Sequence, residues 1–158
     1  MIKIMFVCHG NICRSPMAEF IFKDLAKKQG VANRFLVASS ATSTEEIWNG
    51  IGNPVYPPAK AELERHGLSC GGKRAVQLQK SDYDKYDLFI GMDSANIRNM
   101  FRIFGGDPAG KVHKLMDFTD RGGDVVDPWY SERFDVAYRD IYEGCTALLD
   151  AILKQDKQ

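Results

Sequence analysis

One short stretch near the start of the chain combines a candidate nucleophile with a candidate anion-binding group. It is Cys8-His9-Gly10-Asn11-Ile12-Cys13-Arg14-Ser15, which follows an apolar run at 2–7 and precedes Pro16. We expect a loop between a strand and a helix N-terminus, where backbone N–H groups and the helix dipole attract anions. Arg14 adds a planar guanidinium that can bind two oxygens of a phosphate. The predicted phosphate-binding residues are His9, Gly10, Asn11, Ile12, Cys13, Arg14 and Ser15.

Cys8 is the candidate nucleophile, because helix N-termini and nearby arginines stabilise a thiolate. A thiolate that faces a bound phosphate can attack phosphorus. Cys-x5-Arg alone is a weak pattern, and Cys8 could instead be an ordinary buried thiol at the end of a strand. Three neighbours favour the chemical role. Gly10 permits close approach of the backbone to an anion, Asn11 tolerates a left-handed conformation, and Ser15 could donate a hydrogen bond to the Cys8 sulfur or cap the helix.

A departing alcohol needs a proton, and Asp127 in Asp127-Pro128-Trp129-Tyr130 is the candidate donor. Such a segment can also do no more than initiate a turn. Asp124 is the rival acid on the same loop, whereas Asp93 is expected to cap the helix that starts at Ser94. Three aromatic side chains are predicted to wall the entrance and to suit a flat aryl leaving group: Trp48, Trp129 and Tyr130.

The elements that must position these groups follow from hydrophobic periodicity. Strands are expected at 2–7, 34–39, 87–91 and 112–116, and helices at 16–29, 57–66, 94–104 and from 131 onward. Long loops at 40–56 and 117–130 separate them and would carry functional residues. The alternation predicts one α/β domain, residues 1–158, with three layers and a parallel sheet. Ligands of such sheets bind beyond the carboxyl ends of the strands, where the loop that contains Cys8 should lie.

Composition excludes several classes of partner and cofactor. The 21 basic and 21 acidic residues balance, and they form no basic run that would attract nucleic acid or an anionic membrane. No signal peptide or apolar stretch of about 18 residues is present, so we expect a cytoplasmic protein without membrane contact. The four cysteines have no zinc-ligand spacing, and Cys70 and Cys145 are expected to be structural. No metal or other cofactor is therefore expected.

The motifs together resemble the low-molecular-weight protein tyrosine phosphatases. The resemblance rests on residues 7–19, Trp48, Gly91-Met92-Asp93 followed by Asn96, and Asp127-Pro128-Trp129-Tyr130, and it covers nearly the whole chain in the right order. It implies a four-stranded parallel sheet of order 2-1-3-4 with the phosphate loop between the first strand and the first helix. The expected partners are phosphotyrosine proteins or small aryl phosphates, with inorganic phosphate as product, and the chain is expected to be a monomer or weak dimer.

The implied reaction is hydrolysis of a phosphate monoester through a phosphocysteine on Cys8. Phosphate binds to the loop N–H groups and to Arg14, so preorganised dipoles stabilise its charge and no metal is required. Asp127 first protonates the leaving group and then acts as base for the attacking water.

Other activities stay open at this point. Ile12 fits the tyrosine-directed branch of the family, whereas a Thr would suggest a phosphoarginine phosphatase. An arsenate reductase shares the loop but needs a pair of relay cysteines, and Cys70 has no nearby partner in sequence. A cysteine phosphocarrier module would need neither Arg14 nor an acid that promotes hydrolysis. A silent phosphotyrosine-binding domain would not need Cys8 or Asp127.

Three segments depart from the family pattern. Ser39-Ser40-Ala41-Thr42 stands where Ser-Ala-Gly-Thr is common, and Tyr56-Pro57-Pro58-Ala59 stands where an Asp and an Arg are usual. Gly71-Gly72 stands where a His often buttresses the loop. These changes bear on the support of Asn11 and Ser15.

Cys13 is a candidate redox partner of Cys8. Peroxide converts an accessible thiolate to sulfenic acid, and a second cysteine on the same loop could trap it as a reversible disulfide. The alternative is that Cys13 is only a small residue that fits a crowded loop.

Overall fold

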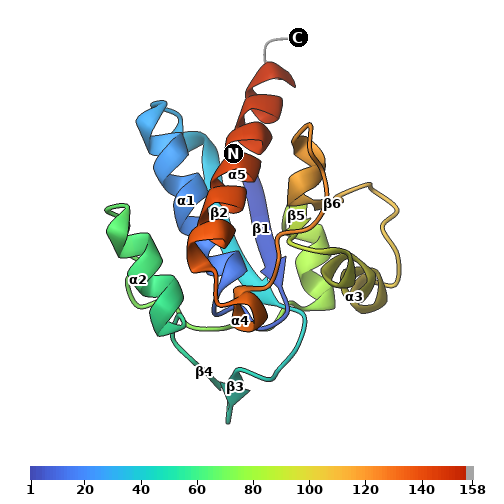
Figure 1. Cartoon of the computed structure of the whole chain (residues 1–158). Coiled ribbons are helices and arrows are strands. Elements are labelled where there is room, and N and C mark those ends of the chain that lie inside the picture. Colours follow the sequence, from blue (N-terminus) through green and yellow to red (C-terminus); the bar gives the residue numbers. More distant parts are fainter. Residues whose placement is uncertain (156–158) are drawn as a thin grey trace.

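A four-stranded parallel sheet with helices on both faces forms the frame of the protein, as the computed structural model of residues 1–155 shows (Figure 1). The strands lie in the order β2-β1-β5-β6, and each adjacent pair is parallel. Counted within the sheet, this is the order 2-1-3-4 that the resemblance implied. The strands are β1 (Ile2–Cys8), β2 (Phe35–Ala41), β5 (Leu88–Gly91) and β6 (Val112–Lys114).

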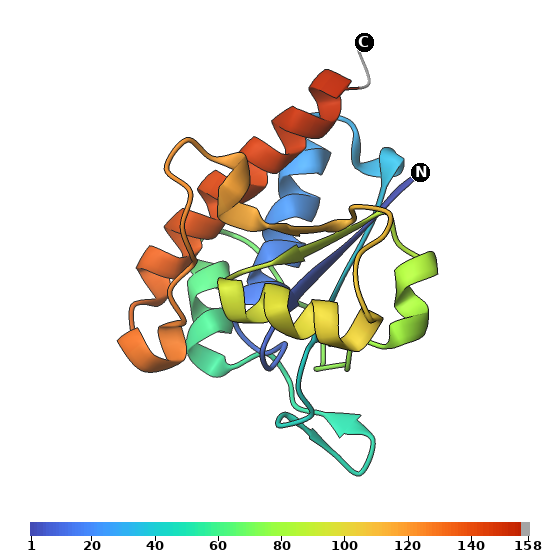
Figure 2. The ribbon, with the colours of Figure 1, turned by 90° about the vertical axis from the view of Figure 1, so that its right-hand side faces the viewer.

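The helices form two layers. One face of the sheet is covered by α1, α2 and α5, and the opposite face by α3 (Figures 1 and 2). The helices are α1 (Arg14–Lys28), α2 (Pro57–Arg65), α3 (Ser94–Phe104), α4 (Pro128–Ser131) and α5 (Phe134–Gln155), with short 3-10 turns η1 (Ala32–Arg34), η2 (Lys80–Asp84) and η3 (Leu115–Phe118). None of the helices within residues 1–155 is both long and apolar enough to span a membrane.

The central strand β1 contributes to the core on both sides of the sheet. Ile4 and Phe6 belong to the cluster under α1 and α5, whereas Met5 and Val7 belong to the cluster under α3. This division follows from the alternation of side chains along a strand. It explains why β1 is apolar at successive positions. Because β1 lies between β2 and β5, its carboxyl end at Cys8 is in the middle of the sheet edge.

Several element boundaries differ from those expected from the sequence. Strand β2 continues to Ala41, because its parallel pairing with β1 extends to Cys8 opposite Ala41. The fourth strand is shorter than predicted, since the chain turns into η3 after Lys114. The final helix begins later than expected: the short helix α4 ends at Ser131, its C-cap Glu132 adopts a positive φ of 62°, and α5 begins at Phe134.

The expected loop at 40–56 contains a small hairpin, β3 (Ile47–Trp48) and β4 (Ile51–Gly52). Asn49 and Gly50 form its turn with φ values of 51° and 76°. Two consecutive positive φ angles are typical of the tight turn that matches strand twist, for which Asn-Gly is the favoured sequence. Figure 1 shows this hairpin extending away from the sheet, beyond α2.

Candidate active site

The loop after β1 curls around the sulfur of Cys8. The side chain is 3 % exposed, and its Sγ accepts hydrogen bonds from the backbone N–H of Asn11 at 3.3 Å and of Ser15 at 3.4 Å. Asn11 adopts the predicted left-handed conformation, with φ 59°, which turns its N–H inward. Two backbone donors aimed at one sulfur favour its negatively charged form.

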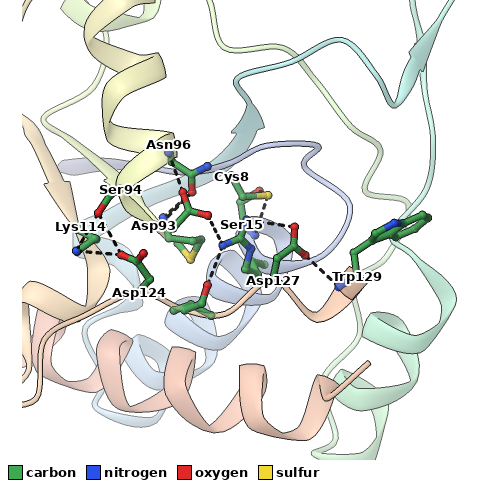
Figure 3. Close-up of polar contacts among 12 residues, drawn as sticks. Cys8, Ser15, Asp93, Ser94, Asn96, Lys114, Asp124, Asp127 and Trp129 are labelled. Atoms are coloured by element: carbon green, nitrogen blue, oxygen red, sulfur yellow. Dashed lines mark hydrogen bonds and ion pairs between the residues drawn. The ribbon is translucent and has the colours of Figure 1, made fainter. Parts of the chain in front are cut away.

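Ser15 does not cap the helix, contrary to one of the two roles expected for it. The helix begins earlier than Pro16, with Cys13 as its N-cap and no capping side chain, so Ser15 lies inside the first turn. Its hydroxyl is 3.0 Å from the Cys8 sulfur, which agrees with the other expected role (Figure 3).

A chain of buried hydrogen bonds determines the direction of the Ser15 hydroxyl. The Glu19 carboxylate accepts from the Ser39 hydroxyl at 2.7 Å, so the Ser39 oxygen accepts from the Asn11 amide at 3.0 Å. The other N–H of that amide donates to the Ser15 oxygen at 2.8 Å. The Ser15 proton is then directed to the Cys8 sulfur at 3.0 Å, although the Ser40 carbonyl also lies at 3.5 Å. The network therefore supplies a third donor to Cys8.

Arg14 is 2 % exposed and is held by groups from other elements. One guanidinium nitrogen donates to the Asp93 carboxylate and to the Val125 carbonyl, each at 2.8 Å. The other terminal nitrogen is 3.6 Å from the Asp127 carboxylate. Burial alone would lower the pKa of Arg14, but the charge of Cys8 and the carboxylates of Asp93 and Asp127 outweigh it and raise that pKa. Arg14 is thus a fixed cation beside the sulfur.

Asp93 has the capping role predicted for it and a second role that the sequence did not indicate. Its carboxylate accepts from the backbone N–H of Asn96 at 2.8 Å and so caps α3. Its other oxygen binds Arg14. The position of Asp93 at the carboxyl end of β5, next to β1 in the sheet, was the signal that could have revealed this contact.

The two candidate acids occupy different surroundings. Asp127 caps the short helix α4 through the N–H of Trp129 at 3.0 Å, and its carboxylate faces the loop (Figure 3). Asp124 instead pairs with Lys114 at 3.0 Å. Although partial burial alone would raise it, the Lys114 ammonium holds the pKa of Asp124 below its usual value. This geometry favours Asp127 as the proton donor.

A cavity of about 150 Å³ opens above the Cys8 sulfur. Asn11 and Ser15, which were expected to bind phosphate, do not line it. Both are buried, and their backbone N–H groups and the Ser15 hydroxyl contact the Cys8 sulfur. Trp129 and Tyr130 stand in its wall as predicted, and Trp129 packs against Tyr56 with ring centroids 4.8 Å apart. The lining residues are Cys8, His9, Gly10, Ile12, Cys13, Arg14, Glu45, Glu46, Asp127, Trp129 and Tyr130.

The hairpin side of the cavity differs from expectation. Trp48, predicted as a third aromatic wall, is 80 % exposed at the hairpin and does not line the cavity. The preceding residues Glu45 and Glu46 do line it, and Glu45 pairs with His9 at 2.9 Å. The sequence offered no signal for these carboxylates, because the path of an irregular loop follows from its long-range contacts.

The remaining cysteines are free thiols in buried positions. Burial raises the pKa of Cys13, and the charge of Cys8 raises it further, so Cys13 is a neutral thiol close to Cys8. Cys145 donates a weak hydrogen bond to the Ala18 carbonyl at 3.7 Å, in keeping with the structural role expected for it. Within residues 1–155, no cluster of His, Cys, Asp and Glu side chains could hold a metal ion.

Comparison with known proteins identifies the family of this chain. A family model for low molecular weight phosphotyrosine protein phosphatases matches residues 3–158. The chain is 38 % identical to the low molecular weight protein-tyrosine-phosphatase YfkJ of Bacillus subtilis, over 98 % of both chains. It is 32 % identical to the corresponding phosphatase of Gallus gallus, over 97 % of this chain and 94 % of that one.

Solved structures show the same relationship. The crystal structure of YfkJ superposes with a TM-score of 0.92, at 37 % identity, and covers 98 % of this chain and 96 % of that one. A structure of the YwlE arginine phosphatase, a mutant with a phosphorylated active-site serine, has a TM-score of 0.81 at 25 % identity over 97 % of both chains.

Proposed function

The chain belongs to the low molecular weight phosphotyrosine protein phosphatase family and is a phosphoric monoester hydrolase, and we propose that Cys8, Arg14 and Asp127 carry out its reaction. The main observation in support is the environment of the Cys8 sulfur, which accepts hydrogen bonds from two backbone N–H groups and lies 3.0 Å from the Ser15 hydroxyl. Arg14 and Asp127 line the cavity into which this sulfur opens. A nucleophile, a cation for the phosphate and a proton donor therefore meet at one place.

The reaction has two displacement steps at phosphorus. The Cys8 thiolate attacks phosphorus, an S–P bond forms, and the P–O bond to the leaving group breaks. Asp127 gives its proton to the departing oxygen. Water then attacks the phosphocysteine while Asp127 takes a proton from it, the S–P bond breaks, and inorganic phosphate leaves with the thiolate restored. Arg14 and the loop N–H groups stabilise the charge on the phosphoryl oxygens in both steps.

The proposed substrate is phosphotyrosine rather than phosphoarginine. Trp129 and Tyr130 offer ring surface beside the site, and Ile12 places an apolar side chain in the cavity. These groups suit a flat phenyl ring. An arsenate reductase is not favoured, because Cys70 lines a separate cavity, whose lining includes no second cysteine. The phosphorylated serine in the YwlE mutant supports a covalent intermediate on the residue at the Cys8 position.

The test is turnover of p-nitrophenyl phosphate without added metal. We expect activity in the presence of EDTA, and loss of it in Cys8→Ser. Arg14→Lys should also be nearly inactive, because it keeps the charge and loses the fork that bridges Asp93 and the phosphate. Parallel assays with phosphotyrosine and phosphoarginine peptides distinguish the two substrate classes. Wild-type turnover by either variant, or inhibition by EDTA, would refute the mechanism.

We further propose one domain that works as a monomer or weak dimer in a reducing compartment such as the cytoplasm. One family model spans residues 3–158, which supports a single domain. All four cysteines are free thiols, and such proteins are typical of reducing compartments. Size-exclusion chromatography with light scattering would measure the oligomeric state.

A further inference from the structure

Lys73 contacts β2, the strand that pairs with β1 next to the Cys8 loop. Its Nζ donates to the backbone carbonyl of Ser39 at 2.9 Å. Ser39 is 1 % exposed, and its hydroxyl is the link between Glu19 and Asn11 in the network that ends at Cys8. Lys73 therefore binds the residue through which the loop is oriented.

The segment that begins with Lys73 also touches Asn11 directly. The backbone N–H of Val76 donates to the side-chain oxygen of Asn11 at 3.0 Å. Val76 and Leu78 pair with Ala41 at the end of β2 through backbone hydrogen bonds of 2.8 Å. The lysine is thus the first contact of a segment that holds both the end of β2 and the amide of Asn11.

The charges around Lys73 connect it to the sulfur as well. The charged groups that act on it are Glu19 and Lys23 of α1 and Cys8, while Lys60 of α2 and Arg74 line the same small cavity as Lys73. Burial lowers the pKa of Lys73, but the charges of Glu19 and Cys8 oppose this effect. Interaction energies between charges are mutual, so an ammonium that Cys8 stabilises also stabilises the Cys8 thiolate.

We propose that Lys73 is a positioning residue for the phosphatase reaction, which holds Ser39 in place and supplies positive charge beside the network that ends at Cys8. It touches neither the substrate cavity nor the reacting atoms. The inference rests on the proposed role of Cys8 as nucleophile. It assigns to Lys73 a function that a lysine anchoring a surface segment would not have.

The experiment compares Lys73→Met, Lys73→Arg and Lys60→Met with the wild-type chain. Lys60 lines the same cavity and is exposed, and its side chain makes no hydrogen bond or ion pair in the part of the chain that the structure describes, so its variant controls for loss of one charge. Two quantities are measured against pH: kcat/KM for p-nitrophenyl phosphate, and the rate of alkylation of Cys8 by iodoacetamide, followed by mass spectrometry. Cys8→Ser gives the background of alkylation at the other thiols.

We expect Lys73→Met to lose on the order of tenfold in kcat/KM, a typical effect for a residue within a coupled network. The pH at which its alkylation is half-maximal should rise, because the thiolate has lost a stabilising charge. Lys73→Arg should restore the alkylation profile, and Lys60→Met should behave as wild type.

A Lys73→Met profile like that of the wild type would overturn the proposal. So would equal losses in the Met and Arg variants with an unchanged alkylation profile, since that pattern belongs to a structural anchor. A wild-type chain without turnover, or an active Cys8→Ser, would instead refute the proposed function.

Discussion

Two adjacent serines on β2 should respond in opposite ways to the same substitution. Ser39 and Ser40 are each 1 % exposed, and they point to opposite faces of the sheet. The Ser39 hydroxyl donates to Glu19 at 2.7 Å and accepts from Asn11 at 3.0 Å. The Ser40 hydroxyl is buried and has no hydrogen-bond partner within residues 1–155. Both backbone carbonyls are kept in an alanine variant, so the comparison isolates the hydroxyl groups.

The free energy of unfolding follows from these partners. Ser39→Ala leaves a Glu19 oxygen and an Asn11 N–H buried without a partner, and each such group costs about 1–3 kcal/mol. The expected loss is therefore about 2–6 kcal/mol, which for a chain of this size lowers Tm by roughly 4–24 °C. Ser40→Ala removes a hydroxyl that pays a desolvation penalty and gains no protein partner, so we expect unchanged or slightly increased stability.

Urea unfolding followed by circular dichroism measures both free energies, and p-nitrophenyl phosphate turnover measures the effect on the site. Ser39→Ala should also lower kcat/KM, because Asn11 loses one of the contacts that orient Ser15 toward Cys8. Ser40→Ala should keep it. Equal destabilisation of the two variants, or a larger loss in Ser40→Ala, would refute the hydrogen-bond network described for this strand.

Three further predictions concern the cavity. Asp127→Asn should slow hydrolysis of substrates with poor leaving groups far more than of those with good ones, by up to about 10²–10⁴-fold, whereas Asp124→Asn should not; a series of substituted phenyl phosphates measures this. Cys13→Ser should keep most activity but lose recovery by dithiothreitol after peroxide treatment; recovery equal to wild type would exclude a protective disulfide. Trp129→Ala should raise KM for aryl phosphates, whereas Trp48→Ala should leave KM unchanged, since Trp48 does not line the cavity.

Local sequence signals predicted the frame and the loop. The apolar run of β1 and the helical periodicity at 94–104 determine where the chain is extended and where it is helical, because both depend on neighbouring residues. The left-handed Asn11 was predictable for the same reason, since few residues other than glycine tolerate that conformation.

The contacts that position Arg14 were not predictable in this way. They join Arg14 to Asp93, 79 positions away in the sequence, and to Val125, 111 positions away. Such contacts exist only once β5 lies beside β1, and the order of strands could not be worked out from periodicity. The same reason applies to Trp48, whose prediction as a wall rested on residue type. Its place depends on the path of the loop at 40–56, where Trp48 lies on a hairpin strand and is 80 % exposed.

The departure at Gly71-Gly72 shows why residue type alone is a poor guide to the support of a catalytic loop. Judged by motif alone, the chain lacks the histidine that the family resemblance leads us to expect at this position, and the support of Asn11 is then in doubt. The structure places the Lys73 ammonium 2.9 Å from the Ser39 carbonyl, with the Glu19 carboxylate bound to the hydroxyl of the same serine. In the role that we propose for Lys73, the loop needs a donor with positive charge beside Ser39, and a flexible lysine can reach that point from a neighbouring position. The requirement is thus set by charge and place, and it can be met by a side chain that an alignment of motifs would overlook.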